Sequence, residues 1–109
     1  MRLKNLYIKE FKNLKDFYID FFGKDMTTVL IGRNGTGKSN LIESLVIIFR
    51  DLDLHNNPSF SYQLAYECNN YDVEIRANEE KKPYYIIAIN QKEIPISKFY
   101  KDITLTLPQ

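Results

Sequence analysis

One eight-residue segment, Gly32-Arg33-Asn34-Gly35-Thr36-Gly37-Lys38-Ser39, constrains this chain more than any other. It fits the pattern G-x-x-x-x-G-K-[ST], in which glycines let backbone N–H groups point inward around an anion without Cβ clashes. Background residue frequencies give about a 0.4% chance of one such match in a chain of this length, so the match is informative. The segment predicts a phosphate-binding loop.

The flanks of the loop agree with that prediction. Met26–Ile31 is short and rich in β-branched residues, which predicts a buried strand running into the loop. Lys38–Arg50 predicts a helix with a wide apolar face, because its apolar residues recur three or four positions apart (Leu41, Leu45, Ile48; Ile42, Val46, Phe49). Asn56, Asn57 and Pro58 end the helical pattern within Asp51–Ser59.

Alternating apolar and polar residues predict strands elsewhere in the chain. Asn69-Asn70 between two alternating runs predicts a β-hairpin, since asparagine tolerates positive φ. The predicted strands are Met1–Phe11, Asp16–Phe21, Tyr62–Cys68, Tyr71–Ala77, Tyr84–Ile89, Ile94–Ile96 and Ile103–Leu107. Only one helix is clear from these patterns.

Composition describes one soluble globular domain. The chain has 109 residues, of which 44% are hydrophobic and 14% aromatic, enough apolar surface to exclude a disordered tail. No apolar run approaches the roughly 20 residues of a membrane span, and the basic N-terminus does not resemble a signal peptide. The one cysteine, Cys68, excludes an intrachain disulfide and a cysteine-built metal site. We therefore expect a cytoplasmic protein without a membrane partner.

The net charge of +1 gives no global field for nucleic acid. The halves differ, however: residues 1–50 hold nine Lys and Arg against five Asp and Glu, whereas residues 51–109 hold six against nine. The positive half contains the glycine-rich loop. That neighbourhood suits a phosphate ligand, although so small an asymmetry is also compatible with chance.

The chemistry of such a loop assigns roles to its residues. The segment Gly32, Arg33, Asn34, Gly35, Thr36 and Gly37 cradles the phosphates, and the positive end of the following helix adds to the same point. Lys38 reaches the β- and γ-phosphates as a point charge, and the Ser39 hydroxyl ligates Mg²⁺. Asn34 lies mid-loop and is a weaker candidate donor to the γ-phosphate.

Hydrolysis needs an acidic strand end for the magnesium as well. Val46–Asp51 superficially fits an apolar run followed by aspartate, but it lies in or at the end of the predicted helix. We therefore expect Asp51 and Asp53 to be solvated carboxylates rather than magnesium ligands. Tyr85–Asn90 comes closest among later segments and ends in asparagine, so the acidic element is missing from the sequence.

The loop and its flanks, Leu30 to Leu45, resemble the ATP-binding-cassette class of P-loop ATPases. More narrowly, they resemble the SMC/RecF/OLD-like (AAA_21-type) ATPases of DNA repair and of anti-phage defence, including Septu-type systems. Leu6–Leu14 matches the strand and Phe-Arg/Lys-Asn/Ser element with which those proteins open. The resemblance implies that Lys12 lies near the nucleotide; a surface lysine on a turn is the alternative. Asn40, beside Ser39, is included among the nucleotide-binding residues.

The resemblance implies an α/β P-loop NTPase fold: an ABC-ATPase-like N-terminal lobe with an antiparallel β-subdomain and one main helix after the loop. Residues 1–59 would hold strands, loop and helix, and residues 60–109 the antiparallel region, together part of a larger ATPase domain. ATP and Mg²⁺ are the implied cofactors. A homodimer or larger assembly is the implied partner, with nucleic acid reached only through it.

Two functions remain open, and a third is disfavoured. The first is ATP and Mg²⁺ binding by an ATPase lobe whose hydrolysis needs the signature serine-glycine motif, acidic strand and switch histidine that this sequence lacks. The second is a nucleotide-sensing module without catalysis. A small-molecule or nucleotide kinase is disfavoured, because such enzymes alternate strands and helices, whereas the pattern here changes to antiparallel strands after one helix. For His55 and Cys68 no role is expected, and the tyrosines favour packing over base stacking.

Overall fold

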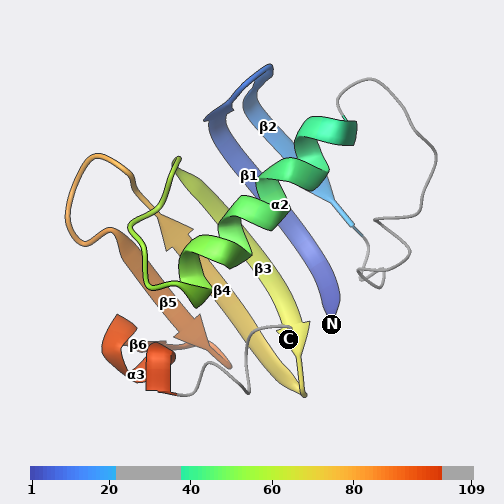
Figure 1. Cartoon of the computed structure of the whole chain (residues 1–109). Helices are drawn as coiled ribbons and strands as arrows, with labels where there is room; N and C mark the ends of the chain where they lie inside the picture. The colour runs from blue at the N-terminus through green and yellow to red at the C-terminus, as the bar shows by residue number, and fades with distance from the viewer. Residues whose placement is uncertain (22–37, 102–109) are drawn as a thin grey trace.

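The computed structural model describes residues 1–21 and 38–101. Within those ranges, six strands form one antiparallel sheet in the order β2-β1-β3-β4-β5-β6 (Figure 1). The strands are β1 (Arg2–Phe11), β2 (Leu14–Asp20), β3 (Tyr62–Cys68), β4 (Tyr71–Ala77), β5 (Tyr85–Ile89) and β6 (Lys92–Ile94). The helices are α2 (Lys38–Asp53) and α3 (Ile96–Lys101).

Helix α2 lies diagonally across one face of the sheet, and α3 lies by the β5–β6 edge (Figure 1). The core fills the space between α2 and the sheet, because the apolar residues of each strand alternate toward the helix. Strand β1 contributes Leu6 and Ile8 to it. The other fully or nearly buried residues include Leu41, Leu45, Ile48 and Leu52 of α2, Leu64 and Tyr66 of β3, Val73 and Ile75 of β4, Ile87 of β5 and Phe99 of α3.

The β3–β4 hairpin forms with the predicted bounds. Asn69 and Asn70 have φ values of 52° and 66°, as a two-residue type I′ turn requires. Cross-strand pairing then runs in register from Cys68 with Tyr71 to Tyr62 with Ala77. Here turn chemistry and side-chain alternation point to the same register, so the local sequence is sufficient to specify it.

Four expectations need correction. The last described strand is Lys92–Ile94 rather than Ile94–Ile96, because Asn90 and Gln91 adopt positive φ and turn the chain back at once. Ile96 instead begins α3, a second helix that the sequence analysis missed; the Pro95 carbonyl accepts the N–H groups of Lys98 and Phe99.

The face of α2 is also narrower than expected. Val46 is 53% exposed, and Ile42 and Phe49 are only partly buried, whereas Leu41, Leu45 and Ile48 form the buried stripe. The helix runs three residues further than predicted, to Asp53. The strand expected at Met26–Ile31, the loop Gly32–Gly37 and the strand expected at Ile103–Leu107 lie outside the described residues.

No helix in the described ranges is both long and apolar enough to cross a membrane. Strands from both predicted regions share the one sheet, since β1 pairs with β2 on one side and with β3 on the other.

Candidate functional site

The β1–β2 turn carries the first candidate site residue. Lys12 and Asn13 connect the two strands, and Lys12 has a φ of 52°, in the left-handed region that tight turns use. Leu14, directly after the turn, is 6% exposed and belongs to the core. The turn is therefore fixed to the body of the protein at its base while the Lys12 side chain is exposed.

This turn lies against the beginning of α2. The Lys12 ammonium is 2.6 Å from the Oε2 atom of Glu43, and the side-chain amide of Asn40 donates a hydrogen bond to the Oδ1 atom of Asn13. Both partners come from the first turns of a helix that starts at Lys38. A strand connection and a helix start that are 27 or more residues apart in sequence thus form one contact.

The aromatic pair of Phe11 and Phe60 lies beside the β1–β2 turn. The Lys12 ammonium lies 5.7 Å from the centroid of the Phe11 ring, a cation–π distance. Phe11 in turn packs on Phe60, with ring centroids 4.8 Å apart. Lys12 is therefore held near the start of α2 by an aromatic face as well as by a carboxylate.

The start of α2 has the chemistry of an anion site. The first N–H groups of any helix lack intrahelical partners and carry the positive end of the helix dipole. The first turn of α2 contains no acidic residue, and the Ser39 side chain is exposed there. A hydroxyl is an oxygen ligand of the kind that Mg²⁺ takes.

The structure thus brings together Lys12, Ser39 and Asn40 among the predicted nucleotide-binding residues. Gly32, Arg33, Asn34, Gly35, Thr36 and Gly37 lie outside the described residues, and Lys38 is described only as the first residue of α2. Asn13 and Glu43 were not predicted from the sequence as site residues. One feature of the sequence could have pointed to Glu43: it is the one acidic residue between Asp25 and Asp51.

The expectation of solvated carboxylates after the helix is wrong for Asp51. Its side chain is 5% exposed, and its Oδ2 atom accepts hydrogen bonds from the backbone N–H (3.1 Å) and hydroxyl (2.7 Å) of Ser59. Asp53 is exposed. Within the described part of the chain, no group of three or more His, Cys, Asp or Glu side chains is placed to hold a metal ion. Asp51 therefore has a structural role.

The remaining singled-out residues pack. Cys68 is a buried free thiol in the core. The His55 ring stacks on Tyr100, with centroids 3.8 Å apart and planes within 10°. Burial raises the pKa of the Tyr66 and Tyr85 hydroxyls.

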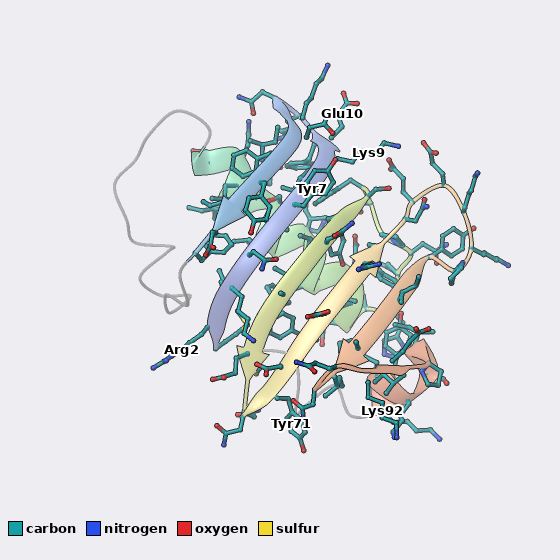
Figure 2. The ribbon with its side chains drawn as sticks, turned by 180° about the vertical axis from the view of Figure 1, so that it is seen from behind. Arg2, Tyr7, Lys9, Glu10, Tyr71 and Lys92 are labelled. Carbon is teal, nitrogen blue, oxygen red and sulfur yellow. The ribbon has the colours of Figure 1, made fainter. Side chains whose placement is uncertain are left out.

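The sheet face opposite α2 holds a second notable surface. Tyr7, Gln63 and Arg76 form one cross-strand row, and Figure 2, which views this side, labels Tyr7 and Lys9 on β1. A groove of about 590 Å³ extends from this row to the β4–β5 connection; its charged lining residues are Lys9, Arg76, Lys81, Lys82 and Glu80. None of the four cations makes an ion pair within the described residues.

Comparison with known proteins decides the family. A model of the AAA ATPase domain (AAA_15) matches residues 1–107, nearly the whole chain. The chain belongs to this family. Among relatives of this AAA ATPase domain are "DNA replication and repair protein RecF" of Trichodesmium erythraeum, 28% identical over 86% of the chain, and that of Francisella tularensis subsp. novicida, 29% identical over 99%.

The "DNA replication and repair protein RecF" of Clostridioides difficile is 40% identical over 44% of the chain. The chain spans 26% and 32% of the length of the Trichodesmium and Francisella proteins and 12% of the Clostridioides one. No solved structure matches. These relatives support the resemblance to P-loop ATPases of the SMC/RecF class that the loop and its flanks carry.

Proposed function

We propose that this AAA ATPase domain binds ATP with Mg²⁺ at the start of α2. The observation that carries the proposal is the contact of the Lys12-Asn13 turn with the first turns of the helix that Lys38 and Ser39 begin. That contact puts a cation beside a helix end that already favours anions. Membership of the ATPase family supplies the independent support.

The proposed roles follow the residue types. The segment Gly32–Gly37 surrounds the phosphates with backbone N–H groups, and Asn34 donates to the γ-phosphate. Lys38 neutralises the β- and γ-phosphates, Ser39 ligates Mg²⁺, and Asn40 fixes the turn that presents Lys12. When bound, Mg²⁺ supplies charge neutralisation of the β- and γ-phosphates.

Hydrolysis is proposed to need an assembly. The 109 residues contain no signature serine-glycine motif and no acidic Asp-Glu strand to complete the magnesium site. A partner subunit that carries these groups would supply them across a shared nucleotide. The relatives' printed name, "DNA replication and repair protein RecF", supports a role in DNA repair for such an assembly. Anti-phage defence is the other role that we propose for it, on the resemblance of the loop and its flanks, and we place both roles in the cytoplasm.

Binding and turnover measured on the same purified chain test this proposal. We expect saturable ATP binding that strengthens with Mg²⁺, a Ser39→Ala variant that loses the Mg²⁺ dependence, and no repeated phosphate release. Multiple turnovers by the isolated chain would contradict the proposal that hydrolysis needs an assembly. Absence of binding even with Mg²⁺ would contradict the binding site itself.

In place of the expectation that nucleic acid is reached only through an assembly, we propose that the groove opposite α2 itself binds a nucleic acid backbone. Lys9, Arg76, Lys81 and Lys82 present four positive charges against one from Glu80, and cationic side chains dominate affinity for phosphodiesters. We expect Arg76→Glu to weaken binding of a fluorescent oligonucleotide at least about tenfold at low salt. Lys98→Glu, on α3 outside the groove, is the matched charge reversal. Equal losses in the two variants would assign the binding to net charge alone.

A further inference from the structure

The ion pair between Lys12 and Glu43 places a negative charge where a phosphate is proposed to bind. Glu43 is five residues after Lys38, about 7.5 Å along the axis of α2. It is the one acidic residue between Asp25 and Asp51, in a segment with three basic ones. A carboxylate at this place opposes an anionic ligand through space, and it also occupies the ammonium that the ligand would use.

The ion pair between Lys12 and Glu43 is weak enough for the two side chains to separate. The Lys12 and Glu43 side chains are 51% and 45% exposed, and exposed pairs of this kind are weak because water screens them. A lysine head is a point charge on a flexible stem, so it can change partner without moving the backbone. A triphosphate, with several charges, is a stronger partner than one carboxylate.

The turn itself does not depend on the ion pair. The Asn13–Asn40 hydrogen bond joins the turn to α2 separately, and Leu14 anchors the turn in the core. The Phe11 ring lies 5.7 Å from the Lys12 ammonium. Breaking the Lys12–Glu43 contact therefore leaves Lys12 beside the start of the helix.

We propose that Glu43 is a competing counter-ion: it holds Lys12 in the nucleotide-free protein, and a bound triphosphate takes Lys12 from it. This inference rests on the proposed nucleotide site. Glu43 then sets the affinity of the site from outside the phosphate cradle. It lowers affinity through Lys12, which distinguishes it from a charge that merely repels the ligand.

A double-mutant cycle on the full chain separates these two effects, with Mg·ATP titrated calorimetrically. We expect Glu43→Gln to tighten binding about two- to fivefold, the range of an exposed pair. Lys12→Ala should weaken binding, and Glu43→Gln should have no further effect in the Lys12→Ala background. The matched control is Glu10→Gln, because Glu10 pairs with Lys15 (3.7 Å) across the same hairpin; it should leave affinity unchanged.

Four outcomes would overturn the inference. An equal gain from Glu43→Gln with and without Lys12 would show simple repulsion. No change from Glu43→Gln, in a chain whose ATP binding Lys38→Ala abolishes, would leave the nucleotide site standing and remove the competition. No ATP binding by the unaltered chain would remove both proposals. Urea unfolding without nucleotide supplies the second readout: Glu43→Gln should keep the unfolding midpoint nearly unchanged, and a large fall would assign Glu43 a structural role.

Discussion

Tyr62 is the residue whose environment differs most from what its type needs. It is 3% exposed, and its hydroxyl has no hydrogen-bond partner within the described part of the chain. Tyr85 lies in the same row of the sheet, since both pair with Ala77, and its hydroxyl donates to the Asn56 carbonyl at 2.9 Å. The sequence could not predict that the Tyr85 hydroxyl has a hydrogen-bond partner and the Tyr62 hydroxyl has none in the described residues. Alternation predicts which face of the sheet a tyrosine occupies, and it does not predict the hydrogen-bond partner of the hydroxyl.

These tyrosines make stability depend on alkaline pH. Burial raises the pKa of Tyr62, Tyr66 and Tyr85 above their ordinary value of 10.0, so the folded state keeps protons that the unfolded state releases. These tyrosines therefore leave the free energy of unfolding unchanged below about pH 10 and lower it as pH rises further. Urea midpoints at pH 8 and at about pH 11 measure this loss. Tyr62→Phe should reduce it; Tyr18→Phe, at a side chain 60% exposed, should not. Equal pH losses in the two variants would contradict this assignment.

At the scale of elements, the sequence was most informative where several local signals agreed. The β3–β4 hairpin has alternation on both strands and two asparagines at its turn, and it formed as predicted. Helix α3 has six residues after a three-residue strand, too short for a periodic pattern to stand out beside β-branched neighbours. Local signals therefore predicted the bounds of the long strands of this hairpin and did not predict the short elements β6 and α3.

The end of α2 is fastened to the next loop by Asp51. Because its buried carboxylate accepts two hydrogen bonds from Ser59, we expect Asp51→Ala to lower the free energy of unfolding by about 2 kcal/mol. Asp53→Ala, at an exposed carboxylate two residues on, should change it by less than about 0.5 kcal/mol. Denaturant unfolding monitored by circular dichroism measures both. Equal effects would mean that Asp51 acts only through the charge of the helix end.

At the scale of the whole molecule, β1 joins the N-terminal part to the later hairpins by pairing with both β2 and β3. That arrangement brings the β1–β2 turn to the start of α2. The sequence indicated each candidate, Lys12 in the turn and Ser39 in the helix, from local motifs and the resemblance. Their joint position depends on pairing between segments more than fifty residues apart, such as Ile8 with Tyr62, which no local pattern encodes. Glu43 was missed for the same reason.

We propose above all that this lobe binds a nucleoside triphosphate at the helix that Lys38 begins. The most direct measurement is a calorimetric titration of the purified chain with Mg·ATP, beside Lys38→Ala and the matched Lys92→Ala on β6. We predict one-site binding by the unaltered chain and by Lys92→Ala, and none by Lys38→Ala. Equal binding by all three proteins, or by none, would contradict this proposal.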